Sequence, residues 1–86
     1  MNINQLILIV TEKINKNISL KNINIEDKTF LHKDHKSNQD GKFHLKLTIM
    51  SQELKKMNKI QSTKKIYSIL GEELKKYIHS IQILII

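Results

Sequence analysis

Residues 43–50 read Phe-His-Leu-Lys-Leu-Thr-Ile-Met, with apolar and polar side chains in strict alternation from Phe43 to Ile49. A period of two is typical of a β-strand that buries one of its faces. The polar side chains of His44, Lys46 and Thr48 would then point to solvent. We therefore expect this strand to lie in a sheet that is covered on one face only.

Two further elements precede this strand. Apolar residues at helical spacing, with polar residues between them, predict an amphipathic helix from about Asn2 to Lys16. Ile23 and Ile25 alternate with polar neighbours, which predicts a half-buried strand from about Leu20 to Asp27. The segment from Lys28 to Lys42 is polar, and its few apolar side chains would offset little of the entropy lost on ordering. We therefore expect a mobile loop between the two strands.

Helical spacing returns after residue 59, at the apolar positions Ile66, Ile69, Leu70 and Leu74. Ser62 or Thr63 can supply the oxygen that caps the start of this helix. Gly71 can end it in left-handed geometry. A second short helical piece then runs to Tyr77, with Glu72 and Glu73 in its first turn, where the helix dipole favours acidic side chains.

The chain ends in a third alternating run, with apolar Ile81, Ile83 and Ile85, which predicts a final strand. Because this strand follows helices, it should pair in parallel with an earlier strand through a crossover. The element order α-β-β-α-α-β predicts a two-layer α/β domain over residues 1–86, with three helical pieces on one face of a three-stranded mixed sheet. The expected core residues are Leu6, Val10, Leu45, Leu47, Ile66, Leu70 and Ile83.

Length and composition exclude several function classes. The chain has 86 residues, a formal net charge of +7 and no cysteine, so disulfides, zinc–thiolate sites and thiol catalysis are excluded. Its apolar runs are far shorter than the ~20 residues of a membrane span, and we expect no membrane association. No glycine-rich phosphate loop or partnered nucleophile is present, so we expect no enzyme activity.

The four histidines are the candidate metal ligands, because neutral imidazole binds zinc, copper and iron. His32 and His35 are three residues apart in the polar segment, His44 lies on the expected solvent face of its strand, and His79 opens the last strand. Spacing alone leaves two interpretations open. These side chains either hold a metal or are ordinary solvated histidines.

Three runs of sequence resemble the BolA family. They are His44 to Ser51, Ile66 to Leu74, and Ile78 to Ile81, which are similar to the family's His-Phe-Lys-Val strand, its Tyr-x-x-Leu-x-Glu-Glu-Leu helix pair and its Val/Ile-His-Ala-Leu strand. The resemblance implies a fold like that of a type II KH domain, in agreement with the element order. It covers about residues 20–84.

The resemblance also implies a partner and a cofactor. Members of this family pair with monothiol glutaredoxins and share a [2Fe–2S] cluster, with glutathione on the partner's side. The family's C-terminal ligand corresponds to His79, and its loop ligand to His32 or alternatively His35, whereas His44 should contribute least. The implied role is iron–sulfur cluster trafficking or assembly, or iron-dependent redox regulation. Alone, the chain should be a cofactor-free monomer, cytoplasmic or, if a targeting segment is missing, mitochondrial.

A nucleic-acid-binding regulator is the alternative function. The candidate contacts are the lysines on and beside the second helix: Lys59, Lys64, Lys65 and Lys75. Many members of the family have Arg-His-Arg at the start of that helix, where this chain has Ser62, Thr63 and Lys64. The chain also lacks the Gly-x-x-Gly loop with which KH domains clamp RNA. We therefore expect DNA binding to be weak and sensitive to salt.

Overall fold

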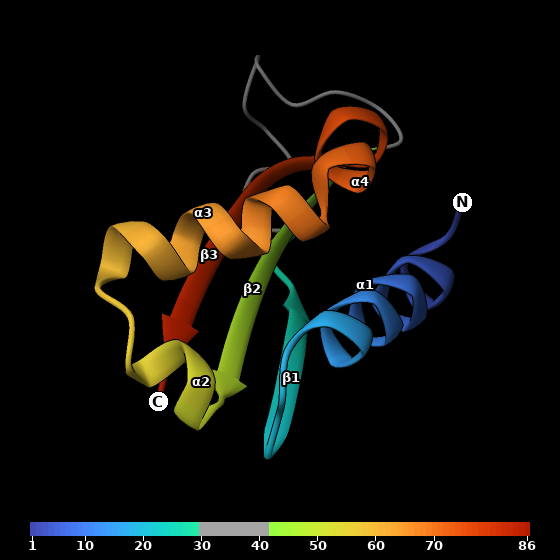
Figure 1. Cartoon of the computed structure of the whole chain (residues 1–86). Coiled ribbons are helices and arrows are strands. Elements are labelled where there is room, and N and C mark those ends of the chain that lie inside the picture. The colour runs from blue at the N-terminus through green and yellow to red at the C-terminus, as the bar shows by residue number, and fades with distance from the viewer. Residues whose placement is uncertain (30–41) are drawn as a thin grey trace.

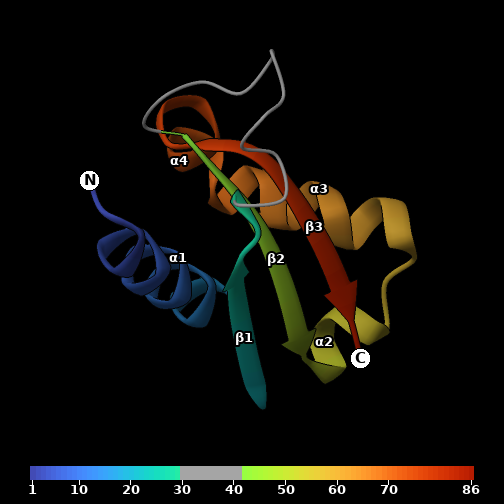
Figure 2. The same ribbon diagram turned by 180° about the vertical axis from the view of Figure 1, so that it is seen from behind.

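The computed structural model describes residues 1–29 and 42–86 of the chain. The expected mobile loop, residues 28–42, therefore lies mostly outside the described residues. Figures 1 and 2 show the helices on one side of a single sheet. The elements are α1 (Ile3–Asn17), β1 (Asn22–Asp27), β2 (Phe43–Met50), α2 (Gln52–Lys55), α3 (Lys59–Ile69), α4 (Gly71–Lys76) and β3 (Ile78–Ile85).

β2 is the central strand of the sheet. The strand order is β1-β2-β3, in which β1 pairs with β2 antiparallel and β3 pairs with β2 in parallel. The three helices α2, α3 and α4 form the crossover between β2 and β3. The predicted two-layer α/β fold with a three-stranded mixed sheet is confirmed.

Asparagine caps begin the two long helices. The Asn2 side chain accepts a hydrogen bond from the Gln5 amide at 2.8 Å, and the Gln5 side chain accepts one from the Asn2 amide at 3.0 Å. Asn58 and Gln61 repeat this arrangement at the start of α3. Such a box satisfies two amides that the helix leaves unpaired, so α3 begins earlier than expected.

Three sequence-based expectations about the helices are wrong: the cap of α3, the role of Gly71, and the number of helical pieces, which is four in the described residues rather than three. Ser62 and Thr63 do not cap α3, and Ser62 is buried within it, where its hydroxyl donates to the Lys59 carbonyl. Gly71 does not close α3 in left-handed geometry but begins α4, after the junction residue Leu70. The four-residue helix α2, capped by the Ser51 side chain, was not expected at all. No helix in the described part of the chain is long and apolar enough to cross a membrane.

The core lies between the helices and the inner face of the sheet. All but one of the expected core residues are buried, and the exception, Ile83, is half-buried against them. β2 contributes three buried side chains to the core, because its neighbours on both sides enclose its inward face. The buried apolar residues are Leu6, Val10, Ile14, Ile18, Leu45, Leu47, Ile49, Leu54, Ile66, Leu70 and Ile78.

Two carboxylates tie the helices together. The buried Glu73 of α4 accepts hydrogen bonds from the Lys13 ammonium of α1 at 2.7 and 3.0 Å. Glu53 of α2 accepts one from the Lys65 ammonium of α3 at 2.7 Å and one from the Ser19 amide at 3.1 Å. The bond from Lys65, followed by that from Ser19, lowers the pKa of Glu53 below its usual value.

Replacing Leu47 with alanine should lower the free energy of unfolding by about 2–5 kcal/mol, because the cavity left in a close-packed core cannot fully collapse. Leu47 has no exposed surface, whereas Leu84 on the neighbouring strand is 47% exposed. Leu84→Ala is therefore the matched control, with an expected loss below about 1 kcal/mol. Urea unfolding of both variants measures the difference, and equal losses would contradict the described packing.

Candidate metal site at the start of β3

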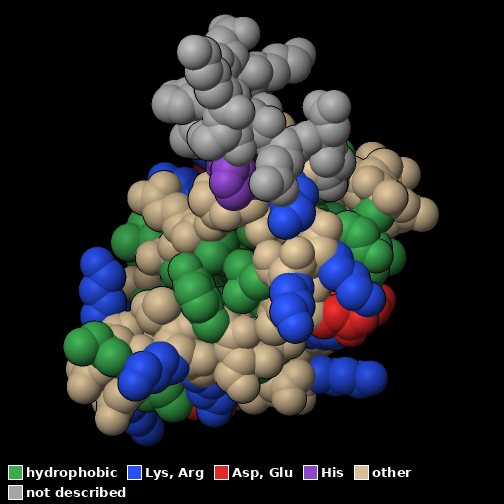
Figure 3. All heavy atoms as spheres, turned by 90° about the horizontal axis from the view of Figure 1, so that it is seen from above, with side chains coloured by type: hydrophobic (Ala, Val, Ile, Leu, Met, Phe, Trp, Pro, Cys, Tyr) green, Lys and Arg blue, Asp and Glu red, His purple; other side chains and the backbone are tan. Residues whose placement is uncertain are grey.

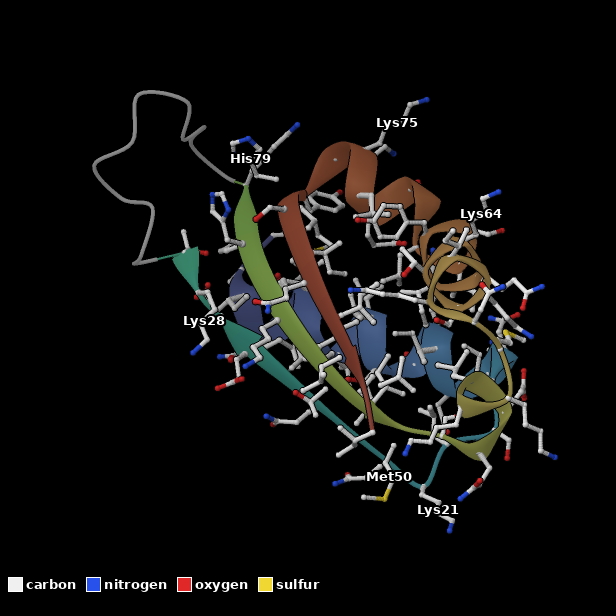
Figure 4. The ribbon with its side chains drawn as sticks, turned by 90° about the vertical axis from the view of Figure 1, so that its left-hand side faces the viewer. Lys21, Lys28, Met50, Lys64, Lys75 and His79 are labelled. Carbon is white, nitrogen blue, oxygen red and sulfur yellow. The ribbon has the colours of Figure 1, made fainter. Side chains whose placement is uncertain are left out.

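The β2–β3 ladder is irregular where it begins. Phe43 pairs with Ile78, but His44 pairs with Ser80, so His79 is an extra residue on β3. A bulge of this kind interrupts the regular pairing and changes the direction of its side chain. His79 is exposed, and Figure 4 shows its ring at the end of the sheet where β3 begins.

The bulge brings a second imidazole beside His79. The ring centroids of His44 and His79 lie 4.7 Å apart, with the ring planes tilted by 56°. His44 is only 5% exposed, so the expectation that it faces solvent is wrong. Alternation assigned His44 to the correct face of β2, but it did not predict that this face is buried at the start of the strand.

Contacts from β3 and from the residues that follow β1 hold His44 on both sides. The Ser80 hydroxyl lies 2.6 Å from Nδ1 of the imidazole. On the other side, the Lys28 amide donates to the His44 carbonyl at 2.7 Å, and the His44 amide donates to the Thr29 hydroxyl oxygen at 3.1 Å. The same Thr29 hydroxyl also donates to the Asp27 carboxylate. These contacts hold both the backbone and the ring of His44 in place.

Paired imidazoles suit a borderline metal such as iron or zinc, since each ring offers a neutral nitrogen. Within residues 1–29 and 42–86, no group of three or more histidine, cysteine or acidic side chains could hold a metal ion. The described part of the chain thus provides two imidazoles, and a complete coordination shell requires donors from elsewhere. His32 and His35, the expected loop ligands, lie outside the described residues.

Three of the four lysines of the alternative hypothesis are exposed, and the fourth, Lys65, is half-buried. Lys64 of α3 and Lys75 of α4 are exposed, and Figure 4 shows both side chains pointing away from the molecule. Lys65 instead pairs with Glu53 at 2.7 Å, and Lys59 lies in the first turn of α3. Figure 3, which looks onto the end where β3 begins, shows histidine surface with lysine side chains nearby.

Sequence reasoning missed the pairing of His44 with His79. In strict alternation His79 would share a face with Ile81, but Ile78 and Ile81 both face the helices and are three residues apart. A strict period of two cannot place both on one face. This odd spacing was the available signal for a bulge, and the bulge aims His79 away from the core.

Comparison with known proteins gives consistent matches. The sequence model of a family described as BolA-like protein matches residues 14–86. A Haemophilus influenzae protein named DNA-binding transcriptional regulator BolA is 34% identical over 73 residues, which make up 85% of this chain and 68% of that protein.

Solved structures match over nearly the whole chain. The BolA domain of SufE1 from Arabidopsis thaliana is 26% identical with a TM-score of 0.76, and BolA1 from the same plant is 27% identical with the same TM-score. In both cases the match covers 91% of this chain and 86% of the other.

Replacing Ser80 with alanine should change the tautomer balance of His44, because Nδ1 loses its hydroxyl partner. The loss of this hydrogen bond should also lower the free energy of unfolding by about 0.5–1.5 kcal/mol. Long-range 15N NMR of the histidine rings measures the balance. Ser68→Ala, at an exposed position of α3, is the control and should leave the His44 nitrogen shifts unchanged. Identical His44 shifts in wild type and Ser80→Ala would refute the contact.

Proposed function

This chain belongs to the BolA-like family, and we propose that it pairs with a monothiol glutaredoxin to share a [2Fe–2S] cluster. In this role it would take part in iron–sulfur cluster trafficking or assembly, or in iron-dependent redox regulation. The proposal rests above all on one observation, the exposed imidazole of His79, which the bulge directs outward and which lies with its centroid 4.7 Å from that of the buried His44 ring.

The donor set of this chain fits half of such a cluster. The chain has no cysteine, so it cannot hold a [2Fe–2S] cluster alone with thiolates, the usual ligands. Two imidazoles can replace two thiolates on one iron, as in Rieske centres, where the exchange raises the reduction potential. The partner's thiolate and glutathione would supply the remaining donors. When bound, the cluster supplies one-electron chemistry or is itself the cargo.

The histidines have different roles in this proposal. His79 is the principal ligand, because it is exposed and the bulge directs it outward. His32 is the second ligand, with His35 as the alternative. His44 is a positioning residue, since it is buried, is held by Ser80, and packs its ring against that of His79.

Co-expression with a monothiol glutaredoxin tests the proposal through the visible absorption spectrum of the copurified complex. His79→Ala should abolish the spectrum of the shared cluster. His32→Ala should weaken or alter it, with partial rescue by His35. His44→Ala should shift the spectrum without abolishing it, because His79 loses the neighbour that orients its ring.

Lys64→Ala is the control for these variants, because Lys64 is exposed on α3 and has no role in the histidine site. Circular dichroism of each variant shows whether it remains folded. An unchanged cluster spectrum with folded His79→Ala would overturn the ligand assignment. Absence of any cluster in the wild-type complex would overturn the proposed function itself.

Nucleic-acid binding is the second candidate function. The Haemophilus influenzae relative is named a DNA-binding transcriptional regulator, and this chain carries a net charge of +7. Lys64 and Lys75 are exposed to contact phosphates, whereas Lys65 is paired with Glu53. The chain has no arginine, the side chain that reads guanine most often. Binding through these lysines would therefore be weak and largely independent of sequence.

The salt dependence of DNA binding tests this second function. Replacing Lys64 and Lys75 together with alanine should weaken binding equally for unrelated duplexes. The slope of log affinity against log salt should become shallower by about 0.9 for each phosphate that the variant no longer neutralises. Lys16 and Lys21, also exposed, provide a control double variant with the same change in charge. Equal weakening of DNA binding by both double variants would exclude a DNA-binding surface at Lys64 and Lys75. Nanomolar binding to one DNA sequence in physiological salt would contradict the expectation of weak binding.

A further inference from the structure

The two edge strands of the sheet differ sharply in charge. β1 carries Glu26 and Asp27, and Lys28 follows it directly. β3 has eight residues, Ile78–Ile85, and none of them is aspartate, glutamate, lysine, arginine or proline, although 27% of the whole chain is charged. Charged residues and prolines normally protect an exposed edge from pairing with other chains. β3 lacks this protection.

The outer edge of β3 has backbone groups available for pairing. The Ile86 amide donates to the Ile49 carbonyl at 2.9 Å, and alternation along the strand directs the amides of Leu84 and Gln82 to β2 as well. The amides and carbonyls of Ile83 and Ile85 therefore point away from the sheet. β3 is the last strand in the sheet order, and no other strand of the described part of the chain pairs with it.

An open groove runs beside this edge, between β3 and the helices α2 and α3. Its volume is about 500 Å³, and Ile83 and Ile85 of β3 line one side. Leu54 and Met57 add apolar surface from the helical side, where Lys55 and Lys59 add positive charge. No acidic side chain lines the groove. Figure 1 shows the end of β3 close to α2 and the start of α3.

We propose that the outer edge of β3 binds an extended, acidic segment of a partner protein, which adds a fourth strand to the sheet. Main-chain hydrogen bonds to Ile83 and Ile85 provide affinity in this mode of recognition, and pockets for alternate side chains provide specificity. Apolar side chains of the segment enter the groove, and its carboxylates meet Lys55 and Lys59. The groove lies beside the last residues of β3, whereas His79 is the second residue of this strand, so the inference extends beyond the shared cluster.

The charges and the backbone together favour an acidic extended peptide over a second copy of the chain and over a nucleic acid. A second copy of the chain would bring another net charge of +7 and the same lysines to the groove, and like charges in contact oppose association. A nucleic acid would satisfy the lysines, but it lacks the main-chain amides and carbonyls that repeat regularly along an extended peptide and pair with the edge of β3. An acidic extended peptide satisfies the lysines, the apolar groove and the backbone edge.

Amide hydrogen exchange of the full chain tests the proposal with a seven-residue peptide of alternating valine and glutamate, acetylated and amidated at its ends. The peptide should slow exchange of the Ile83 and Ile85 amides at least about tenfold. The amides of Gln82 and Leu84, which already bond to β2, should change little. The same peptide with every backbone amide N-methylated loses its donors, and its methyl groups prevent close approach to the edge of β3, so it should give no protection.

Charge reversal tests the side-chain contribution. Lys55→Glu together with Lys59→Glu should weaken peptide binding at least about fivefold, as expected for the loss of exposed ion pairs and the new repulsion. Lys64→Glu together with Lys75→Glu makes the same change in net charge away from the groove and should have less than a twofold effect. Equal weakening of peptide binding by the two double variants would show that the partner's carboxylates do not contact Lys55 and Lys59 and would overturn this part of the proposal.

Three further outcomes would overturn the proposal. The first is peptide binding that leaves exchange at Ile83 and Ile85 unchanged. The second is protection of these amides that rises with protein concentration in the absence of peptide, which would identify a second copy as the occupant. The third is binding of a twelve-nucleotide oligothymidine to the groove while the peptide does not bind, which would identify a nucleic acid.

Discussion

One extra residue, His79, separates the two registers of the parallel β2–β3 ladder. The core requires this residue, because Ile78 is buried and Ile81 also packs against the core, although the two are three positions apart. A regular strand would turn one of them to solvent. The bulge lets both face the helices, and as a result it directs His79 outward beside His44. Packing of the core and assembly of the histidine pair are thus consequences of the same local irregularity.

The sequence predicted most of the fold but only part of the candidate site. Alternation along residues 43–49 and the helical spacing of Leu6 and Val10 are strong signals, because each repeats over several residues and the inward side chains that it defines are buried. The start of α3 was misplaced, since an asparagine–glutamine box at Asn58 outcompeted the hydroxyl caps. His79 was identified through a resemblance, and its neighbour was not. Periodicity assigns a side chain to a face, but the burial of His44 depends on residues that approach it in space, among them Thr29 after β1 and Ser80 of β3.

β3 carries two surfaces of different character. Its start presents an imidazole held against a second one, and its other end presents uncharged backbone beside a groove rimmed by lysine. A partner that donates thiolates to a shared cluster and a partner that adds a strand would contact separate ends of the same element. The sheet holds both ends in fixed relation, because β2 pairs with β3 along almost its whole length.

Pulsed electron paramagnetic resonance of the reduced complex tests most directly whether this chain ligates the shared cluster. The chain is labelled with 15N-histidine and combined with an unlabelled monothiol glutaredoxin and glutathione. Our account predicts 15N hyperfine coupling from a directly bound imidazole, and the same complex prepared with 14N-histidine should lack this 15N coupling. A reduced cluster that forms in the complex without any coupling to 15N would contradict the account, because the imidazoles of this chain would then not bind the iron.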